Sequence, residues 1–198
     1  MSNGTPQVSS QDSGQQIDRL ADENALLRAS LSDARARLDE LEQLADGDML
    51  TSLSNRRAFL KELKRVVGQA GRHGTPAAML YIDLKGLKAI NERHGRLAGD
   101  AALIHVARSL LGLIRSTDML ARIGGDMFAL ILDHLDHNSA IETGDRLARC
   151  IAASPVDLGG TEISVEAFIG VTSILPGDSV DEVMARADQN MARARTGF

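Results

Sequence analysis

Apolar residues recur along the chain with two different spacings, which divide it into a helical N-terminal part and a mixed domain. From Ile17 to Ala45 the apolar positions follow a heptad repeat, whereas residues 1–16 contain almost no large apolar side chain. Heptad spacing gathers apolar residues on one side of a helix, so residues 17–47 are predicted to form a coiled-coil helix. Residues 1–16 cannot bury enough surface to offset their ordering entropy, and they are predicted to be disordered.

The heptad positions favour a parallel homodimer through residues 17–45. Leucine fills d positions such as Leu20 and Leu27, and Asn24 stands at an a position, where a buried Asn selects register and a two-stranded state. Opposite charges would meet between the two chains at two g–e pairs, Glu23 with Arg28 and Arg37 with Glu42. The alternative is a single amphipathic helix that packs on its own domain.

Residues 48–198 alternate helical and strand-like segments, as expected for one medium-sized domain. Strands are predicted at 77–82, 119–123, 128–132 and 161–173, with a small edge piece at 156–158. Helices are predicted at 56–69, 137–153 and 180–195, together with one that Gly99 and Asp100 open. This order predicts an α/β fold of the α+β sandwich type, with a central, mostly antiparallel sheet flanked by helices.

A Gly-Gly pair between two apolar runs predicts a β-hairpin. Gly124 and Gly125 can adopt the positive φ values that a tight two-residue turn requires. A turn without side chains lets a phosphate or a base approach its backbone, and the carboxylate of Asp126 could hold a divalent cation. An ordinary hairpin with a solvated Asp accounts for the same residues.

The composition narrows the range of functions. The net charge is −5, the sequence pI is about 5.5 and there is no Lys/Arg-rich tract, so binding to nucleic acid is not expected. No apolar run approaches the roughly 18 to 20 residues that span a bilayer, so no membrane span is expected. Cys150 is the only cysteine, which excludes an internal disulfide. Together these features favour a cytoplasmic protein.

Three segments resemble the GGDEF family of diguanylate cyclases, which join two GTP molecules into cyclic di-GMP. Residues 48–57, DMLTSLSNRR, resemble the motif DxLTxLxNRR at which these domains begin, and residues 81–103 resemble DxDxFKxxNDxxGHxxGDxxL. The signature itself, Gly124 to Phe128, reads GGDMF. The resemblance covers about Asp48 to Arg195, and it implies a palm-type nucleotidyl-cyclase domain.

The resemblance also implies the nucleotide-binding residues. Asn91 and Asp100 fall where the family reads the guanine edge, although Asp100 could equally be a favourable charge at a helix N-terminus. Lys88 lies near the phosphates, and Arg195 stands where the family has a phosphate-contacting Lys. Arg96 replaces the His of the family's Gly-His pair.

The implied metal site is incomplete. The resemblance assigns Asp83, the carbonyl of Leu84 and Asp126 to Mg²⁺, but Lys85 replaces a second acidic residue of the strand motif. At the fourth signature position, where the family needs an acidic residue for turnover, stands Met127. A thioether can neither take a proton nor hold a hard cation, so the signature predicts a degenerate cyclase with negligible turnover.

Arg115 and Asp118 form an RxxD pattern just before the hairpin. Such a pair at a helix end is often solvated, but its offset from the signature matches the family's inhibitory site for cyclic di-GMP. The sequence therefore predicts a dimeric receptor that binds cyclic di-GMP or GTP and acts on an unknown protein partner. Two alternatives are a weak or conditional cyclase and a scaffold that uses no nucleotide.

Overall fold

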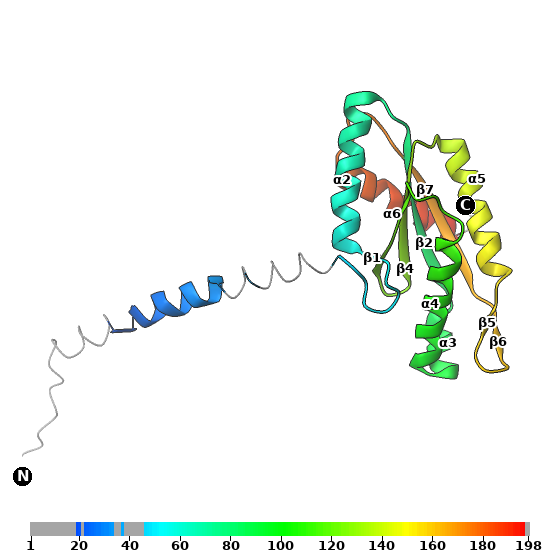
Figure 1. Cartoon of the computed structure of the whole chain (residues 1–198), viewed down its shortest axis with the longest axis horizontal. Coiled ribbons are helices and arrows are strands. Elements are labelled where there is room, and N and C mark those ends of the chain that lie inside the picture. The colour runs from blue at the N-terminus through cyan, green and yellow to red at the C-terminus, as the bar shows by residue number, and fades with distance from the viewer. Residues whose placement is uncertain (1–18, 21, 34–36, 38–45, 197–198) are drawn as a thin grey trace, which may run out of the picture. The chain divides into compact units, whose positions relative to one another are not determined.

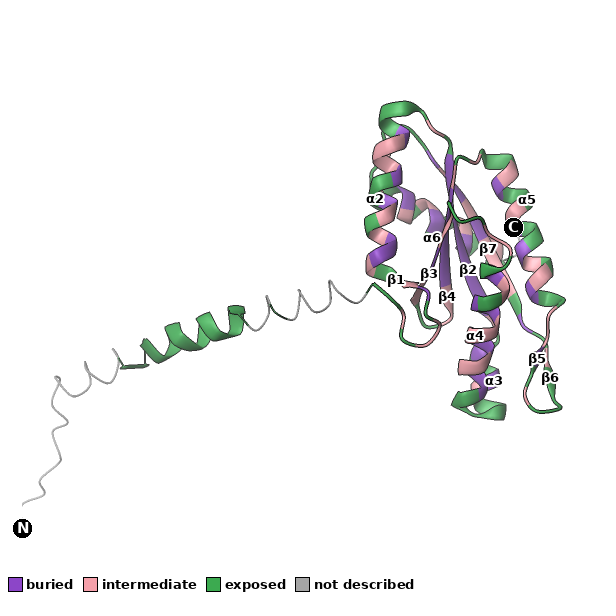
Figure 2. Cartoon of the chain, viewed as in Figure 1, coloured by how far each residue is buried: buried purple, intermediate pink, exposed green. Residues whose placement is uncertain are grey.

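The computed structural model describes residues 19–20, 22–33, 37 and 46–196, and the chain divides into two units at residue 46. In the first unit every described residue is helical and exposed, including the heptad leucines Leu20, Leu27 and Leu31 (Figure 2). The predicted tail at residues 1–16 and much of the predicted coiled coil lie outside the described residues. The helical prediction is confirmed for the part of the heptad region that the structure describes.

The second unit is an α/β domain whose elements follow the predicted order (Figure 1). Its helices are α2 (Arg56–His73), α3 (Leu87–His94), α4 (Arg96–Leu111), α5 (His137–Ala152) and α6 (Val180–Thr196). Its strands are β1 (Ser54–Asn55), β2 (Ala77–Lys85), β3 (Met119–Gly124), β4 (Met127–Asp133), β5 (Val156–Asp157), β6 (Glu162–Ile163) and β7 (Glu166–Ile174).

Five strands form the central sheet in the order β1-β3-β4-β2-β7. The short β1 is parallel to β3, and every other neighbouring pair in this sheet is antiparallel. The predicted fold class is therefore confirmed. Strand β2 lies between β4 and β7, and eight of its nine residues are buried because helices cover both faces of the sheet.

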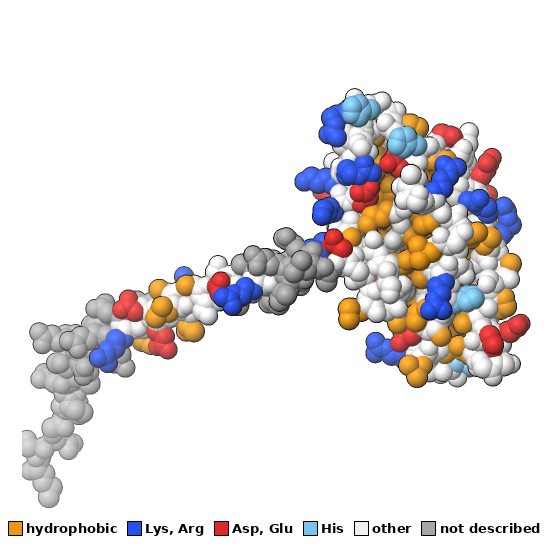
Figure 3. Space-filling view, viewed as in Figure 1, with side chains coloured by type: hydrophobic (Ala, Val, Ile, Leu, Met, Phe, Trp, Pro, Cys, Tyr) orange, Lys and Arg blue, Asp and Glu red, His pale blue; other side chains and the backbone are white. Residues whose placement is uncertain are grey.

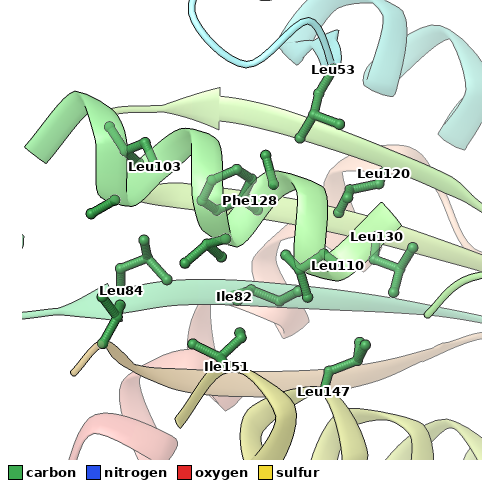
Figure 4. Packing of buried hydrophobic residues seen from close by; sticks show 14 of the residues in the cluster. Leu53, Ile82, Leu84, Leu103, Leu110, Leu120, Phe128, Leu130, Leu147 and Ile151 are labelled. Atoms are coloured by element: carbon green, nitrogen blue, oxygen red, sulfur yellow. The ribbon is translucent and has the colours of Figure 1, made fainter. Parts of the chain in front are cut away.

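Alternate residues of β2 enter two separate hydrophobic cores, as the two-residue period of a strand requires. Leu80 and Ile82 face a core that α4 and α5 complete with Leu110, Leu147 and others (Figure 4). Met79 and Tyr81 face the opposite core, which α2 and α6 cover. The sheet is thus the middle layer of a three-layer sandwich, and the helices on both faces are held by burial of apolar surface.

Two predicted element boundaries are wrong. Gly99 and Asp100 do not open a helix, because α4 already begins at Arg96. Gly95, with a φ of 85°, ends α3 and turns the chain into α4, so the break falls four residues earlier. The single strand predicted at 161–173 is also divided. Its start, β6, pairs with β5 in a separate two-stranded sheet, and only β7 joins the main sheet.

The surface of the second unit carries charges of both signs. In the face that Figure 3 shows, acidic and basic side chains are interspersed rather than gathered into one large patch. Among the described residues, no helix is both long and apolar enough to cross a membrane.

Candidate nucleotide site

A cavity of about 450 Å³ collects most of the predicted nucleotide-binding residues. Helices α3 and α4 contribute Lys88, Asn91 and Asp100, and the hairpin between β3 and β4 contributes Gly125 and Asp126. Its remaining lining residues are Leu87, Arg96, Gly99, Leu103 and Arg122. The volume lies within the range of small-molecule sites, and apolar, acidic and basic side chains all border the space.

Close packing fixes Asn91 at this cavity. A Cβ built on Gly99 would lie 2.0 Å from Asn91 Oδ1, so a larger residue on α4 at this point would displace the Asn91 side chain. The Oδ1 atom is buried and has no hydrogen-bond partner among the described residues. Gly99 therefore leaves room for Asn91 in its present position, and it does not open a helix as the sequence suggested. Asp100 lies in the second turn of α4, beyond the first turn in which a favourable helix-end charge acts.

The hairpin is confirmed, but its turn differs from the prediction. Gly124 is still part of β3, opposite Met127, and the two turn residues are Gly125 and Asp126. A register irregularity between Arg122 and Gly124 shifts the turn by one residue. Gly125, with a φ of 51°, supplies the left-handed conformation. Phe128 is completely buried, so the last signature residue belongs to the hydrophobic core.

Arg122 joins this turn to the loop that precedes α2. Its Nη2 and Nε donate to the Gly125 carbonyl at 2.7 and 3.1 Å, and its Nη1 lies 3.3 Å from both carboxylate oxygens of Asp48. Asp48 also accepts hydrogen bonds from the backbone N–H and the hydroxyl of Thr51. Although burial raises the pKa of Asp48, these bonds and the charge of Arg122 outweigh it and hold that pKa below its ordinary value.

The first predicted metal ligand is engaged by an arginine. Asp83 lies on β2 opposite Met127 of β4, and the Leu84 N–H donates to the Asp126 carbonyl at 3.2 Å. Arg195 of α6 directs both Nε and Nη2 to Asp83 Oδ2, each at 2.9 Å. The pKa of Asp83 is raised above its ordinary value, because burial and the charge of Asp126 outweigh the lowering by the charge and the hydrogen bond of Arg195.

The donors around Asp83 do not fit a Mg²⁺ site. Mg²⁺ requires an octahedron of oxygen ligands at short range, and here the guanidinium of Arg195 takes the lone pairs of one Asp83 oxygen. Lys85 forms an ion pair with Glu166 and lies over the ring of Phe168, and so offers no oxygen. Among the described residues, no group of three or more acidic, His or Cys side chains is placed to hold a metal ion.

Arg115 and Asp118 lie away from this cavity, in a tight turn before β3. The Arg115 N–H donates to Asp118 Oδ2 at 2.9 Å, and the Asp118 N–H donates to the Arg115 carbonyl at 3.1 Å. Both residues border two hollows, one of which also includes Arg146 of α5. Arg146 Nη2 donates to the Leu113 carbonyl at 3.4 Å, which brings a second guanidinium to the RxxD turn.

The family follows from a comparison with protein-family models. Residues 45–197 match the model of the diguanylate cyclase GGDEF domain. The chain belongs to the GGDEF family. Diguanylate cyclases use Mg²⁺. In this GGDEF domain Asp83, the first residue assigned to that ion, is paired with Arg195.

Similar proteins come from several bacteria. The chain is 35% identical over 179 residues to the bifunctional diguanylate cyclase/cyclic di-GMP phosphodiesterase MucR of Pseudomonas aeruginosa, covering 89% of this chain and 25% of MucR. It is 36% identical over 160 residues to the diguanylate cyclase TpbB of the same species, covering 80% of this chain and 36% of TpbB. The GGDEF domain described here thus corresponds to a minor part of each relative's length.

Solved structures share the fold. The coiled coil and GGDEF domain of DgcB from Caulobacter crescentus, in complex with c-di-GMP, superposes with a TM-score of 0.74 at 26% identity, covering 92% of this chain and 95% of that one. Diguanylate cyclase SiaD of Pseudomonas aeruginosa, in complex with its activator SiaC, gives a TM-score of 0.75 at 26% identity, covering 95% of this chain and 72% of that one.

The sequence prediction gave no binding role to three arginines and misjudged the contact of a fourth. Arg96 and Arg122 border the cavity, and Arg146 borders the RxxD turn. Arg122 lies two residues before Gly124, the first signature glycine, so its position was a usable signal. Arg146 had no such signal, because it is one of several charged residues on α5. Arg195 was expected near phosphate, and the structure places it on Asp83.

Asp48→Asn is expected to lower the free energy of unfolding at pH 7 by about 1–3 kcal/mol, because it removes the charge that Arg122 and Thr51 stabilise. The pKa of Asp48 is lower in the folded state than its ordinary value of 3.8. Its stabilisation is therefore complete above pH 3.8 and is lost as the pH falls through the lower folded value.

Urea unfolding of both proteins at pH 7 and at about pH 3 measures this effect. Asp46→Asn is the matched control, because Asp46 pairs with Arg57 at a more exposed position and should cost less than about 1 kcal/mol. A loss for Asp48→Asn that is equally large at both pH values would contradict the assignment.

Proposed function

We propose that this GGDEF protein is a catalytically impaired cyclase that acts as a dimeric receptor for cyclic di-GMP. The observation that carries the proposal is the contrast between its two sites. The signature has Met127 where turnover needs an acidic residue, and Asp83 is engaged by Arg195. The turn of Arg115 and Asp118 keeps its RxxD residues and has Arg146 beside it.

Loss of catalysis follows from the chemistry of the reaction. A 3′-hydroxyl must lose a proton, and charge on the triphosphate must be stabilised as the new bond forms. Loss of a general base alone lowers a rate by roughly 10²–10⁴-fold, and a lost metal ligand lowers it further. Met127 supplies neither function. The alternative of a weak or conditional cyclase requires another group to take the proton.

Binding of cyclic di-GMP is supported by the charges at the RxxD turn. A guanidinium can donate in pairs to a phosphate or to the Hoogsteen edge of guanine, and a carboxylate can accept from guanine N–H groups. Arg115, Asp118 and Arg146 provide both kinds of group on neighbouring elements. The DgcB structure, a GGDEF domain with its coiled coil, is a complex with c-di-GMP.

A guanine nucleotide in the cavity of Asn91 and Asp100 is a second part of the proposal. Both residues border the cavity, and Lys88 and Arg96 add positive charge suited to phosphate. GTP bound there without turnover would act as a second signal. The scaffold alternative requires that neither nucleotide binds, with the protein partner recruited in some other way.

The homodimer is proposed to form through residues 17–45. Support comes from the described part of this region, where Leu20, Leu27 and Leu31 recur at heptad positions and are exposed in the single chain. Exposed leucines at this spacing are those that a second helix would bury. A cytoplasmic location and a protein partner complete the proposal, in keeping with the solved complex of SiaD with its activator SiaC.

Calorimetric titration with cyclic di-GMP tests the receptor directly. Micromolar binding is expected for the full chain, and Arg115→Ala and Arg146→Ala should each weaken it by about tenfold or more, because each removes charge-assisted hydrogen bonds. Arg149→Ala is the matched control, an exposed arginine one turn further along α5, and it should leave binding unchanged. Unchanged affinity in Arg115→Ala, or no binding at all, would contradict the receptor.

Sedimentation of an Asn24→Lys, Leu27→Lys double variant tests the dimer. Charges at two successive core positions of the predicted coiled coil should repel each other between the chains and yield a monomer. The unchanged chain should sediment as a dimer. A dimer that persists in the double variant would place the interface elsewhere.

A further inference from the structure

The Arg195 guanidinium contacts Asp83, the residue that the family resemblance assigns to the metal ion. Asp83 is a buried carboxylate on the central strand, and the charge of Asp126 acts on it from the neighbouring turn. Burial and the charge of Asp126 both disfavour the charged form of Asp83, so a positive partner stabilises its carboxylate. The Arg195 Nε donates to Asp83 Oδ2 at 2.9 Å, and its Nη2 lies 2.9 Å from the same oxygen.

The packing of α6 against β7 delivers Arg195 to this position. A Cβ built on Gly170 would lie 2.7 Å from the backbone nitrogen of Met191, so the helix lies directly on the strand. Asn190 Nδ2 also donates to the Val171 carbonyl at 2.7 Å and to the Thr172 hydroxyl at 3.1 Å. Both contacts lie within two turns of Arg195, and they hold this part of α6 against β7. The ion pair therefore joins a half-exposed Arg195 side chain, on a helix that is anchored by packing, to a buried carboxylate.

Other side chains at this end of the sheet favour a monovalent cation over a divalent one. Met127 lies opposite Asp83 in the strand register and contributes no charge. Lys85, in place of an acidic residue, is neutralised by Glu166. A divalent cation would compete with Arg195 for the oxygens of Asp83 and would be repelled by the guanidinium.

Arg195 can bind Asp83 and phosphate together. A guanidinium has five N–H donors, and the Nε–H is donated to Asp83, so donors on the two Nη atoms remain for phosphate oxygens. Asp126, which acts on Asp83, also borders the cavity of Asn91 and Asp100. The Leu84 N–H, next to Asp83 in the chain, donates to the Asp126 carbonyl at 3.2 Å, so the ion pair lies beside the signature turn that borders the cavity. Arg195 is not itself a lining residue, and the phosphates of a nucleotide held by its base in the cavity would reach it by extending past this turn.

We propose that Arg195 takes the place of the divalent cation, so that this cavity binds GTP without a metal ion. The inference rests on the proposed binding of a guanine nucleotide, and it specifies that the nucleotide binds in its metal-free form. The protein would then respond to nucleotide concentration independently of Mg²⁺.

Titration of the full chain with GTP, in excess EDTA and in excess MgCl₂, tests the proposal. The two affinities should agree within about threefold. Arg195→Ala should weaken binding in EDTA by about tenfold or more, and Mg²⁺ should restore part of the loss because Asp83 is then free to bind it. Arg193→Ala is the matched control, since Arg193 is exposed on the same helix. Arg195→Lys, which keeps the charge, should bind more tightly than Arg195→Ala in EDTA.

A second measurement adds Mn²⁺ without nucleotide and monitors its electron paramagnetic resonance signal. The unchanged protein should leave the signal of free Mn²⁺, and Arg195→Ala should bind the ion. Mn²⁺ bound by the unchanged protein and lost in Asp83→Asn would overturn the inference, as would GTP affinity that falls tenfold or more in EDTA.

Absence of GTP binding in every buffer would overturn both the inference and the GTP part of the proposed function. The cyclic di-GMP titration tests the receptor proposal separately, because Arg115 and Asp118 do not border this cavity. Failure of GTP binding would therefore leave the receptor proposal standing.

Discussion

The ion pair of Asp83 and Arg195 connects three parts of the domain that carry its chemistry. Asp83 belongs to the central strand β2, which is buried between two helical layers, and Arg195 comes from the last helix. The signature turn is tied to the same place by the hydrogen bond from Leu84 to Asp126. A carboxylate can remain at such a buried position only when a positive charge satisfies it. In this structure the guanidinium of Arg195 supplies that charge.

The two candidate nucleotide sites lie on different elements, and this separation allows one to change while the other is kept. The cavity is formed by α3, α4 and the β3–β4 hairpin, whereas the RxxD turn lies between α4 and β3 beside α5. Substitution of an acidic residue by Met127 alters the signature without disturbing Phe128 or the strand pairing behind it. The proposed function therefore combines an intact fold and RxxD turn with an impaired reaction.

Local patterns in the sequence were enough to predict the fold class and the hairpin. The family resemblance pointed to Asn91, Asp100 and Asp126, which border one cavity in the structure. Local patterns failed where structure depends on distant contacts. Arg195 and Asp83 are 112 residues apart, and Arg122 and Asp48 are 74 apart, so no local spacing indicates either pair. The two-residue strand β6 is too short for alternation to be read, so the sequence did not separate it from β7.

The break between α3 and α4 was misplaced for a different reason. Both Gly95 and Gly99 are compatible with a helix start, and only the structure shows their separate roles. Gly95 adopts a positive φ at the turn, whereas Gly99 leaves space for Asn91 inside the helical pair. A glycine needed for a turn and a glycine needed for close packing look alike in the sequence.

Turnover of radiolabelled GTP by the purified full chain is the most direct test of the central claim that this GGDEF domain no longer acts as a cyclase. The account predicts no cyclic di-GMP above background with Mg²⁺ or Mn²⁺, because Met127 cannot take the proton and Arg195 occupies Asp83. Product formed at ordinary cyclase rates would contradict it.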